Sequence, residues 1–206
     1  HVHCSVFSPD GKYLFTNDLG TDKIYQYKFN ATFTQPLNDE DVVTTDVEDG
    51  SGPRHIAFHP NQKFAYVINE LSGKVKAFQY NDGKLTEIQT IESDNTGGKE
   101  DKGSADIHIT PNGQYLYTTN RAKANDIAIY RVQSNGMLTL LGHQSTLGIH
   151  PRNFAIDPTG KYLLVANRDT NNIVVFTIIK STGLLEPTNQ TINLEKPVCI
   201  KFTELK

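Results

Sequence analysis

The sequence has little of what usually staples or anchors a small protein: it contains no tryptophan, one methionine and two cysteines in 206 residues. Cys4 and Cys199 fall at equivalent places in two repeated apolar strands. We therefore expect two buried thiols rather than a disulfide or a metal pair. Because the lack of a disulfide framework favours a reducing compartment, the sequence predicts a cytoplasmic protein.

Long apolar runs and an excess of one charge are also missing. The longest apolar run, residues 173–179, is interrupted by Thr177 and fits a buried strand. A membrane span would need about eighteen apolar residues or more. The net charge of −3 gives no indication of a surface that binds polyanions. We therefore expect neither a membrane nor a nucleic acid as partner.

The sequence also lacks helical periodicity, because no segment repeats its apolar residues about every 3.6 positions. This indicates an all-β chain. The chain starts at His1 inside a strand-like pattern, and its only methionine is Met137. We therefore expect an N-terminal portion, with any localisation signal, to precede it.

The clearest feature that is present is a hairpin over residues 51–71. Apolar residues alternate on both sides of a turn that starts at Pro60, which predicts antiparallel strands at roughly 53–59 and 63–69. Arg54 begins the first strand, so it lies beside Glu70 at the end of the second. An ion pair that only stabilises the hairpin would explain this pairing equally well.

The same turn occurs four times, and this repeat is the strongest indication of the fold. The turns follow Pro9, Pro60, Pro111 and Pro158, which are 51, 51 and 47 residues apart. Four-stranded antiparallel units of this period, apolar on both strand faces, are typical of β-propeller blades. A β-sandwich is the alternative, but it would have one solvated face per strand and no constant period.

We therefore expect a single portion of a β-propeller, with blades at about 1–50, 51–102, 103–148 and 149–195 and a further first strand in the tail, 196–206. Two connections break the pattern. Residues 30–49 hold a bend at Pro36 to Asn38 and an expected outer strand near 42–46. Residues 93–103 contain no apolar side chain, which predicts a mobile segment that is either a lid or an ordinary solvated loop.

Propeller topology brings polar residues of separate blades together, because each innermost strand starts beside the end of the second strand at one mouth of the central channel. The residues at these places are His3, Arg54, Arg152, Glu70, Arg121 and Arg168. Guanidinium groups bind carboxylate or phosphate in a bidentate way, and the imidazole and carboxylate supply acid–base groups. The set predicts a site for a small anionic molecule that needs no cofactor.

The histidines do not indicate a metal. His1 and His3 form an i, i+2 pair on one strand face, but no third ligand has the spacing of a metal site. We interpret His108 as a hydrogen-bonded core histidine.

Four motifs, HxH, GPRH, NEL and NR, occur within segments such as HVHCSVFSPDGKYLFTNDLG and GSGPRHIAFHPNQKFAYVINEL. Over nearly the whole chain they resemble the lactonase family of seven-bladed propellers, which includes 6-phosphogluconolactonases of the cycloisomerase type and the fungal 3-carboxy-cis,cis-muconate lactonizing enzyme. The resemblance implies that about three N-terminal blades, or a second chain, complete the propeller. It also implies that the tail is the inner strand of the closing blade.

The resemblance assigns roles to particular residues. It implies His3 as an acid–base residue, Arg54 and Arg121 as anion binders, and Glu70 as a second acid–base or orienting group. These four are the expected catalytic residues. The expected substrate-binding residues are Arg152 and Asn153 of the HPRN motif and, from the topology above, Arg168.

The function implied is hydrolysis of a sugar lactone such as 6-phosphogluconolactone, by arginine-assisted acid–base catalysis at the central channel. Reversible lactonization of a muconate by the same groups is an alternative. A third hypothesis is a non-catalytic propeller that binds a ligand or a protein.

Overall fold

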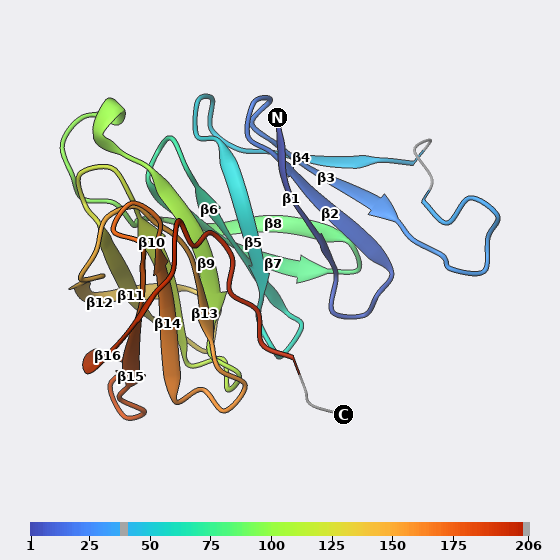
Figure 1. Ribbon diagram of the computed structural model, residues 1–206. Coiled ribbons are helices and arrows are strands. Elements are labelled where there is room, and N and C mark those ends of the chain that lie inside the picture. Colours follow the sequence, from blue (N-terminus) through green and yellow to red (C-terminus); the bar gives the residue numbers. More distant parts are fainter. Residues whose placement is uncertain (38–40, 204–206) are drawn as a thin grey trace.

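The computed structural model describes residues 1–37 and 41–203, which form four antiparallel sheets of four strands each (Figure 1). The first sheet consists of β1 (Val2–Phe7), β2 (Tyr13–Asp18), β3 (Lys23–Lys28) and β4 (Val43–Asp46). The second consists of β5 (Pro53–Phe58), β6 (Phe64–Asn69), β7 (Lys74–Asn81) and β8 (Lys84–Glu92). The third consists of β9 (Ser104–Ile109), β10 (Tyr115–Asn120), β11 (Asp126–Val132) and β12 (Leu138–Ser145). The fourth consists of β13 (Pro151–Ile156), β14 (Tyr162–Asn167), β15 (Asn172–Ile178) and β16 (Leu185–Asn193).

Within every sheet the strands follow one another in sequence order, as the repeated hairpins predicted. A short 3-10 helix covers Lys99–Asp101. The all-β prediction is confirmed, and β4 forms where the outer strand near 42–46 was expected. Among the described residues no helix has the length and apolar character needed to cross a membrane.

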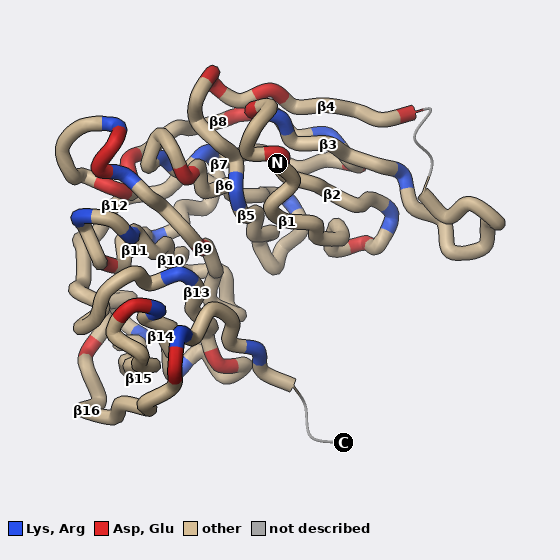
Figure 2. The backbone as a smooth tube through the Cα atoms, turned by 45° about the horizontal axis from the view of Figure 1, so that its top comes forward, with Lys and Arg blue, Asp and Glu red and all other residues tan. Residues whose placement is uncertain are grey.

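The sheets follow one another around an arc, with the first and fourth sheets at its two ends (Figure 2). The first strands of successive sheets, β1, β5, β9 and β13, contact one another on the inner side of this arc. The core lies between sheets, because the strands are apolar on both faces. Its three clusters centre on Phe15 and Phe78, on Tyr66 and Tyr130, and on Tyr117 and Phe154.

A recurring contact fixes each sheet to the hairpin tip of the next one. Gly136 and Gly183, with φ of +83° and +77°, lie at the β11–β12 and β15–β16 tips. The hydroxyls of Tyr66 and Tyr117 donate to the carbonyl oxygens of these glycines, at 3.0 and 2.7 Å. A Cβ at Gly136 would lie 2.3 Å from the Phe64 ring, so both the backbone conformation and the available space require glycine there.

A second recurring contact holds the chain where it passes from one sheet to the next. In three sheets the turn between the second and third strands contains a residue of positive φ, whose side-chain oxygen accepts a hydrogen bond from a backbone N–H of the outgoing connection. The acceptors Asp22, Asn125 and Asn171 bind the N–H groups of Gly52, His150 and Lys196 at 2.7, 2.8 and 2.9 Å. The order of the sheets around the arc is therefore fixed by side chains as well as by packing.

The prediction that residues 93–103 are mobile is wrong for the start of this segment. Ser93 and Asp94 are fully buried. The Ser93 hydroxyl donates to Asn120 Oδ1 at 2.9 Å, and the Lys102 ammonium donates to the Asp94 carbonyl oxygen at 2.8 Å. Polar anchoring of this kind is not visible in a composition without apolar residues.

The prediction of two buried thiols is also wrong, since Cys199 is exposed and Cys4 is only partly buried. The tail explains the exposure of Cys199, because residues 196–203 form no ladder with any other described strand. The tail is held instead by a bond from the Ile200 N–H to Asn153 Oδ1 at 2.6 Å. That the tail belongs to a closing blade stays a prediction, and the predicted bend at 36–38 includes Asn38, which lies outside the described residues.

Candidate active site

The inner strands share an irregularity near their first residues, where the ladder with the second strand skips one residue. In β5 the residues on either side of Arg54 pair with successive residues of β6, so Arg54 is the extra residue of a β-bulge. The same interruption occurs at His3 in β1, at Arg152 in β13 and within residues 104–107 of β9. A bulge re-aims a side chain out of the regular alternation of a strand. The four sheets therefore redirect side chains at equivalent places, all at the same end of the inner strands.

Glu70 joins two arginines at this end. Its Oε2 accepts from Arg54 Nε and its Oε1 pairs with Arg121 Nη2, both at 2.7 Å (strands β5 and β6 and the end of β10). The Arg54 side chain is 1% exposed and also donates to the carbonyl oxygen of Ala105. Arg121 donates from Nε to the carbonyl oxygen of Gly103 at 2.9 Å. The hairpin ion pair expected from the sequence is present, and it is shared with the third sheet.

The charges of this group fix its protonation. Burial alone would raise the pKa of Glu70, but Arg121 and Arg54 outweigh it and hold that pKa below its usual range. Burial, reinforced by the positive charge of Arg121, lowers the pKa of Arg54 to about 10. At neutral pH both side chains are therefore charged, and Glu70 is better suited to orient the arginines than to accept a proton.

His3 lies beside this group, with its ring centroid 5.2 Å from that of His55. Burial, followed by the positive charge of Arg54, lowers the pKa of His3 to about 4. The imidazole is therefore neutral at pH 7 and has a lone pair with which to accept a proton.

The remaining predicted residues divide into two groups. The charge of Arg152 contributes to lowering the pKa of both His3 and Arg54, so Arg152 lies near the same cluster. The Asn153 side chain donates a hydrogen bond to Asp106 and accepts one from the Ile200 N–H. It is therefore engaged within the protein rather than directed at this cluster. Arg168 is 41% exposed and pairs with Asp169 at 3.1 Å. Arg168 is thus more exposed than Arg121, and its described ion pair is with Asp169 and not with Glu70.

The sequence analysis did not identify one buried carboxylate that lies next to this cluster. Asp106 in β9 is 2% exposed. Its Oδ1 accepts from His55 Nδ1 at 2.6 Å, and its Oδ2 accepts from His108 Nε2 at 3.1 Å and from Asn153 Nδ2 at 2.5 Å. Burial alone would raise the pKa of Asp106, but His108 and His55 hold it well below its usual range. The signal available in the sequence was a carboxylate between the apolar residues Ala105 and Ile107 of a predicted inner strand.

His108 differs from its sequence interpretation. It is hydrogen-bonded, as expected, but its side chain is 36% exposed and is not part of the core. The register of β9 explains this, because the irregularity within residues 104–107 shifts the alternation that follows it.

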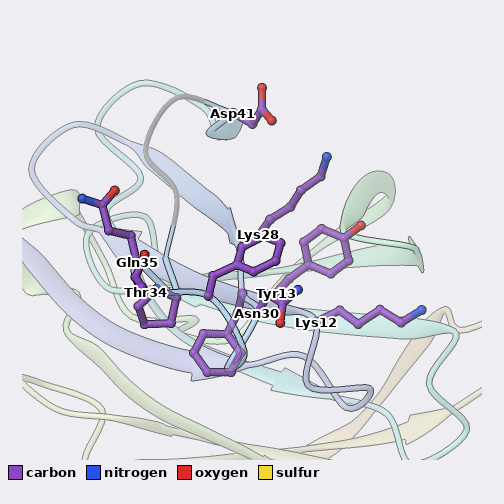
Figure 3. Close-up of a pocket in the computed structure, with 10 residues that line it drawn as sticks. Lys12, Tyr13, Lys28, Asn30, Thr34, Gln35 and Asp41 are labelled. Carbon is purple, nitrogen blue, oxygen red and sulfur yellow. The ribbon is translucent and has the colours of Figure 1, made fainter.

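A separate cavity of about 660 Å³ lies at the opposite end of the first sheet, between the β1–β2 turn and the connection after β3 (Figure 3). Lys12, Lys28 and Phe29 line it together with residues of the 30–36 segment. It does not coincide with the arginine–glutamate cluster, and we do not assign it to the site. Within residues 1–37 and 41–203 no three His, Cys, Asp or Glu side chains are arranged to hold a metal ion.

Four-stranded sheets that pack face to face, with their first strands innermost, define the class of this chain as a β-propeller. Two arginines ion-paired to one carboxylate, with a neutral imidazole beside them, lie where the inner strands of this propeller begin. The chain belongs to the lactonase family of seven-bladed β-propellers, whose family model matches residues 1–202.

Its relatives agree with this family. The chain is 46% identical over 160 residues to the 6-phosphogluconolactonase of Formosa agariphila, with 76% of this chain and 45% of that protein covered. It is 38% identical over 205 residues to the 6-phosphogluconolactonase of Bacillus subtilis, with 98% and 57% covered. The solved periplasmic gluconolactonase PpgL of Pseudomonas aeruginosa matches with a TM-score of 0.91 at 33% identity, with 100% of this chain and 58% of that chain covered. The chain thus spans about half the length of these relatives.

Proposed function

We propose that the complete protein to which this chain belongs is a lactonase that hydrolyses an anionic sugar lactone such as 6-phosphogluconolactone. The observation that carries the proposal is the ion-paired group of Arg54, Glu70 and Arg121 beside the neutral imidazole of His3. The names of the two bacterial relatives above support the same substrate.

The arginines serve two purposes in this proposal. Arg121 and Arg152 bind the phosphate or carboxylate of the substrate, because a guanidinium group matches either anion with two parallel hydrogen bonds. Arg54 is the most deeply buried of them, and it stabilises the negative charge that develops on the lactone carbonyl oxygen. Such a charge is stabilised most strongly by a donor that is already oriented and shielded from water. Glu70 holds both of its arginine partners in place.

His3 transfers the proton. A water molecule attacks the lactone carbonyl carbon and gives its proton to the neutral His3 imidazole, which forms a tetrahedral oxyanion. When the oxyanion collapses, the bond from the carbonyl carbon to the ring oxygen breaks, and the imidazolium returns the proton to that oxygen. The product is the open hydroxy acid, and His3 is neutral again.

Two parts of this proposal concern the rest of the protein. We propose that the remaining blades complete the channel wall opposite the described cluster, as expected for a seven-bladed family. We also propose a cytoplasmic location, on the ground that Cys4 and Cys199 are free thiols. Cell fractionation tests the location, and recovery in the periplasm, the compartment in the name of PpgL, would contradict it.

The muconate reaction is the second candidate, because a neutral imidazole and a cluster of arginines also suit proton transfer next to a carboxylate. The test is to assay the full-length protein with 6-phosphogluconolactone and with 3-carboxy-cis,cis-muconate, and to identify the products. Hydrolysis of the first substrate alone supports the lactonase. Cyclisation of the second alone replaces it, and activity with neither leaves the non-catalytic propeller as the function.

Two variants test the residue assignment in the same assay. Arg54→Ala combined with Glu70→Ala is expected to lower kcat/KM about 100-fold or more, since a preoriented donor is worth about that much. Arg131→Ala is the matched control, because Arg131 contacts the Tyr115 ring away from the mouth, and it is expected to leave kcat/KM unchanged. Wild-type rates in the double variant would overturn the assignment.

A further inference from the structure

Asp106 is a buried charge that joins three sheets. Its two oxygens accept hydrogen bonds from five donors on β5, β9 and β13. The Oδ1 donors are His55 Nδ1 and Ile107 N, and the Oδ2 donors are His108 Nε2, Asn153 Nδ2 and Phe154 N. The donors offset the cost of removing a carboxylate from water.

The propeller itself does not require a carboxylate at this position. The equivalent residue, five before the turn proline, is Cys4 in the first sheet, His55 in the second and Asn153 in the fourth. A carboxylate is therefore not a general feature of this position in the repeat.

His55 connects Asp106 to the cluster at the mouth. One ring nitrogen, Nδ1, lies 2.6 Å from Asp106 Oδ1, and the other, Nε2, lies 3.2 Å from Arg54 Nη1. A guanidinium nitrogen only donates, so Nε2 must be the acceptor, and Nδ1 must carry the proton that goes to Asp106. The carboxylate thus selects the one tautomer of His55 that can accept a hydrogen bond from Arg54.

Arg54 is held from three sides as a result. Its Nε binds Glu70, and its Nη1 binds both the Ala105 carbonyl oxygen and His55 Nε2. Ala105 precedes Asp106 in β9, so both contacts of Nη1 depend on the place where Asp106 fixes the strand. The orientation of the most buried arginine is therefore set from the third sheet.

We propose that Asp106 is a positioning residue for Arg54, acting through the Nδ1–H tautomer of His55. The proposal rests on the proposed function only in that Arg54 stabilises the developing oxyanion. Asp106 contacts neither the substrate nor the reacting atoms.

The test is Asp106→Asn in the full-length protein. Three donors meet Oδ2, so the amide oxygen of the variant turns to them and its NH2 group faces His55. Nδ1 must then accept, the proton moves to Nε2, and two donors oppose each other between His55 and Arg54. With ¹⁵N-labelled histidine, NMR is expected to show the Nδ1–H tautomer of His55 in the wild type and the Nε2–H tautomer in the variant. His55→Gln assigns the resonances.

Kinetics give the second readout. Displacing Arg54 is expected to lower kcat with 6-phosphogluconolactone about 10- to 100-fold with little change in KM, since a small misplacement of an oriented group costs about that much. In an Arg54→Lys background Asp106→Asn is expected to have almost no further effect, because the group it positions is already altered. Asp126→Asn is the matched control: Asp126 pairs with His143 Nδ1 at 2.9 Å between β11 and β12, and its loss should leave kcat unchanged.

The outcomes are distinct. A wild-type His55 that carries its proton on Nε2 overturns the proposal without any variant, even if Asp106→Asn fails to fold. An unchanged tautomer or an unchanged kcat in a folded Asp106→Asn variant also overturns it. If the wild type hydrolyses no lactone but His55 changes tautomer as described, the proposed function fails and the positioning of Arg54 by Asp106 stands.

Discussion

Glu70 shows at the residue scale how much one carboxylate can hold together. It is the shared partner of two arginines from different sheets, one of them almost fully buried. Without it, two positive charges remain close together in a poorly solvated place.

We expect Glu70→Gln to lower the free energy of unfolding by about 3 kcal/mol, because removing one partner of a buried pair leaves the other uncompensated. Urea denaturation of the full-length protein measures this. The control is Lys23→Met, which breaks the exposed pair with Asp46 and should leave the unfolding midpoint where it was. Equal midpoints for Glu70→Gln and wild type would contradict the role of Glu70.

His3 gives a pH dependence of known sign. Its pKa is about 4 in the folded protein and about 6.5 in the unfolded chain. As the pH falls below 6.5 the unfolded chain therefore binds the proton first, and stability is lost down to about pH 4. We expect the free energy of unfolding of His3→Gln to fall less over this range than that of the wild type. His150 and His143 are present in both proteins, so identical slopes would show that His3 is not the cause.

The sequence allowed the main residues of the cluster to be predicted because hairpin geometry is local. Strand pairing places Arg54 beside Glu70 without any knowledge of the other sheets, and the repeat then places Arg121 and Arg152. Asp106 could not be found in this way, because its partners come from three sheets and become neighbours only when the sheets pack. Arg168 occupied the right position in the repeat, but its pairing with Asp169 is settled by the local turn.

At the scale of elements, the residues at the hairpin tips determine how neighbouring sheets pack. Gly136 has φ of +83° and lies under the Phe64 ring, whereas Gly11 has φ of +69° and nothing within 4 Å of the position of a Cβ. We expect Gly11→Ala to cost about 1 kcal/mol for its backbone conformation, and Gly136→Ala to cost about 3 kcal/mol because a clash is added. Thermal unfolding of both variants provides the measurement. Equal losses would mean that the tip does not pack on its neighbour.

The elements themselves were predictable for a simple reason. Alternating apolar residues and turn residues such as Asn81-Asp82-Gly83 act over a few positions, and the structure places β7 and β8 on either side of that turn. The bulges were not predictable, because an extra residue is recognised only from its pairing with the neighbouring strand, which the sequence of one strand does not give. The anchoring of Ser93 was also missed, because a polar residue gives no sign of burial until its partner Asn120 is placed.

At the scale of the whole molecule, the net charge and the site have opposite signs. The chain carries a net charge of −3, but its arginines gather where the inner strands begin. The anionic substrate proposed above would therefore be attracted by a local field, whose screening length is about 30 Å at 0.01 M and about 8 Å at 0.15 M ionic strength.

We expect the KM of the full-length protein for 6-phosphogluconolactone to rise several-fold over this range of salt, with kcat nearly constant. The uncharged gluconolactone is the control substrate, and its KM should not change. Steady-state kinetics at several salt concentrations measure both. A KM for the phosphorylated substrate that is insensitive to salt would contradict an arginine-bound phosphate.

The bulge at Arg54 has a consequence for how such a protein can change over evolutionary time. Deleting this extra residue would restore an unbroken ladder and remove the arginine from β5, while Pro53 and His55 on either side could keep their partners on β6. Small insertions and deletions in an inner strand can therefore exchange the chemistry of the channel in one event. The architecture is inherited unaltered, and new reactivity needs neither a new blade nor a rebuilt core.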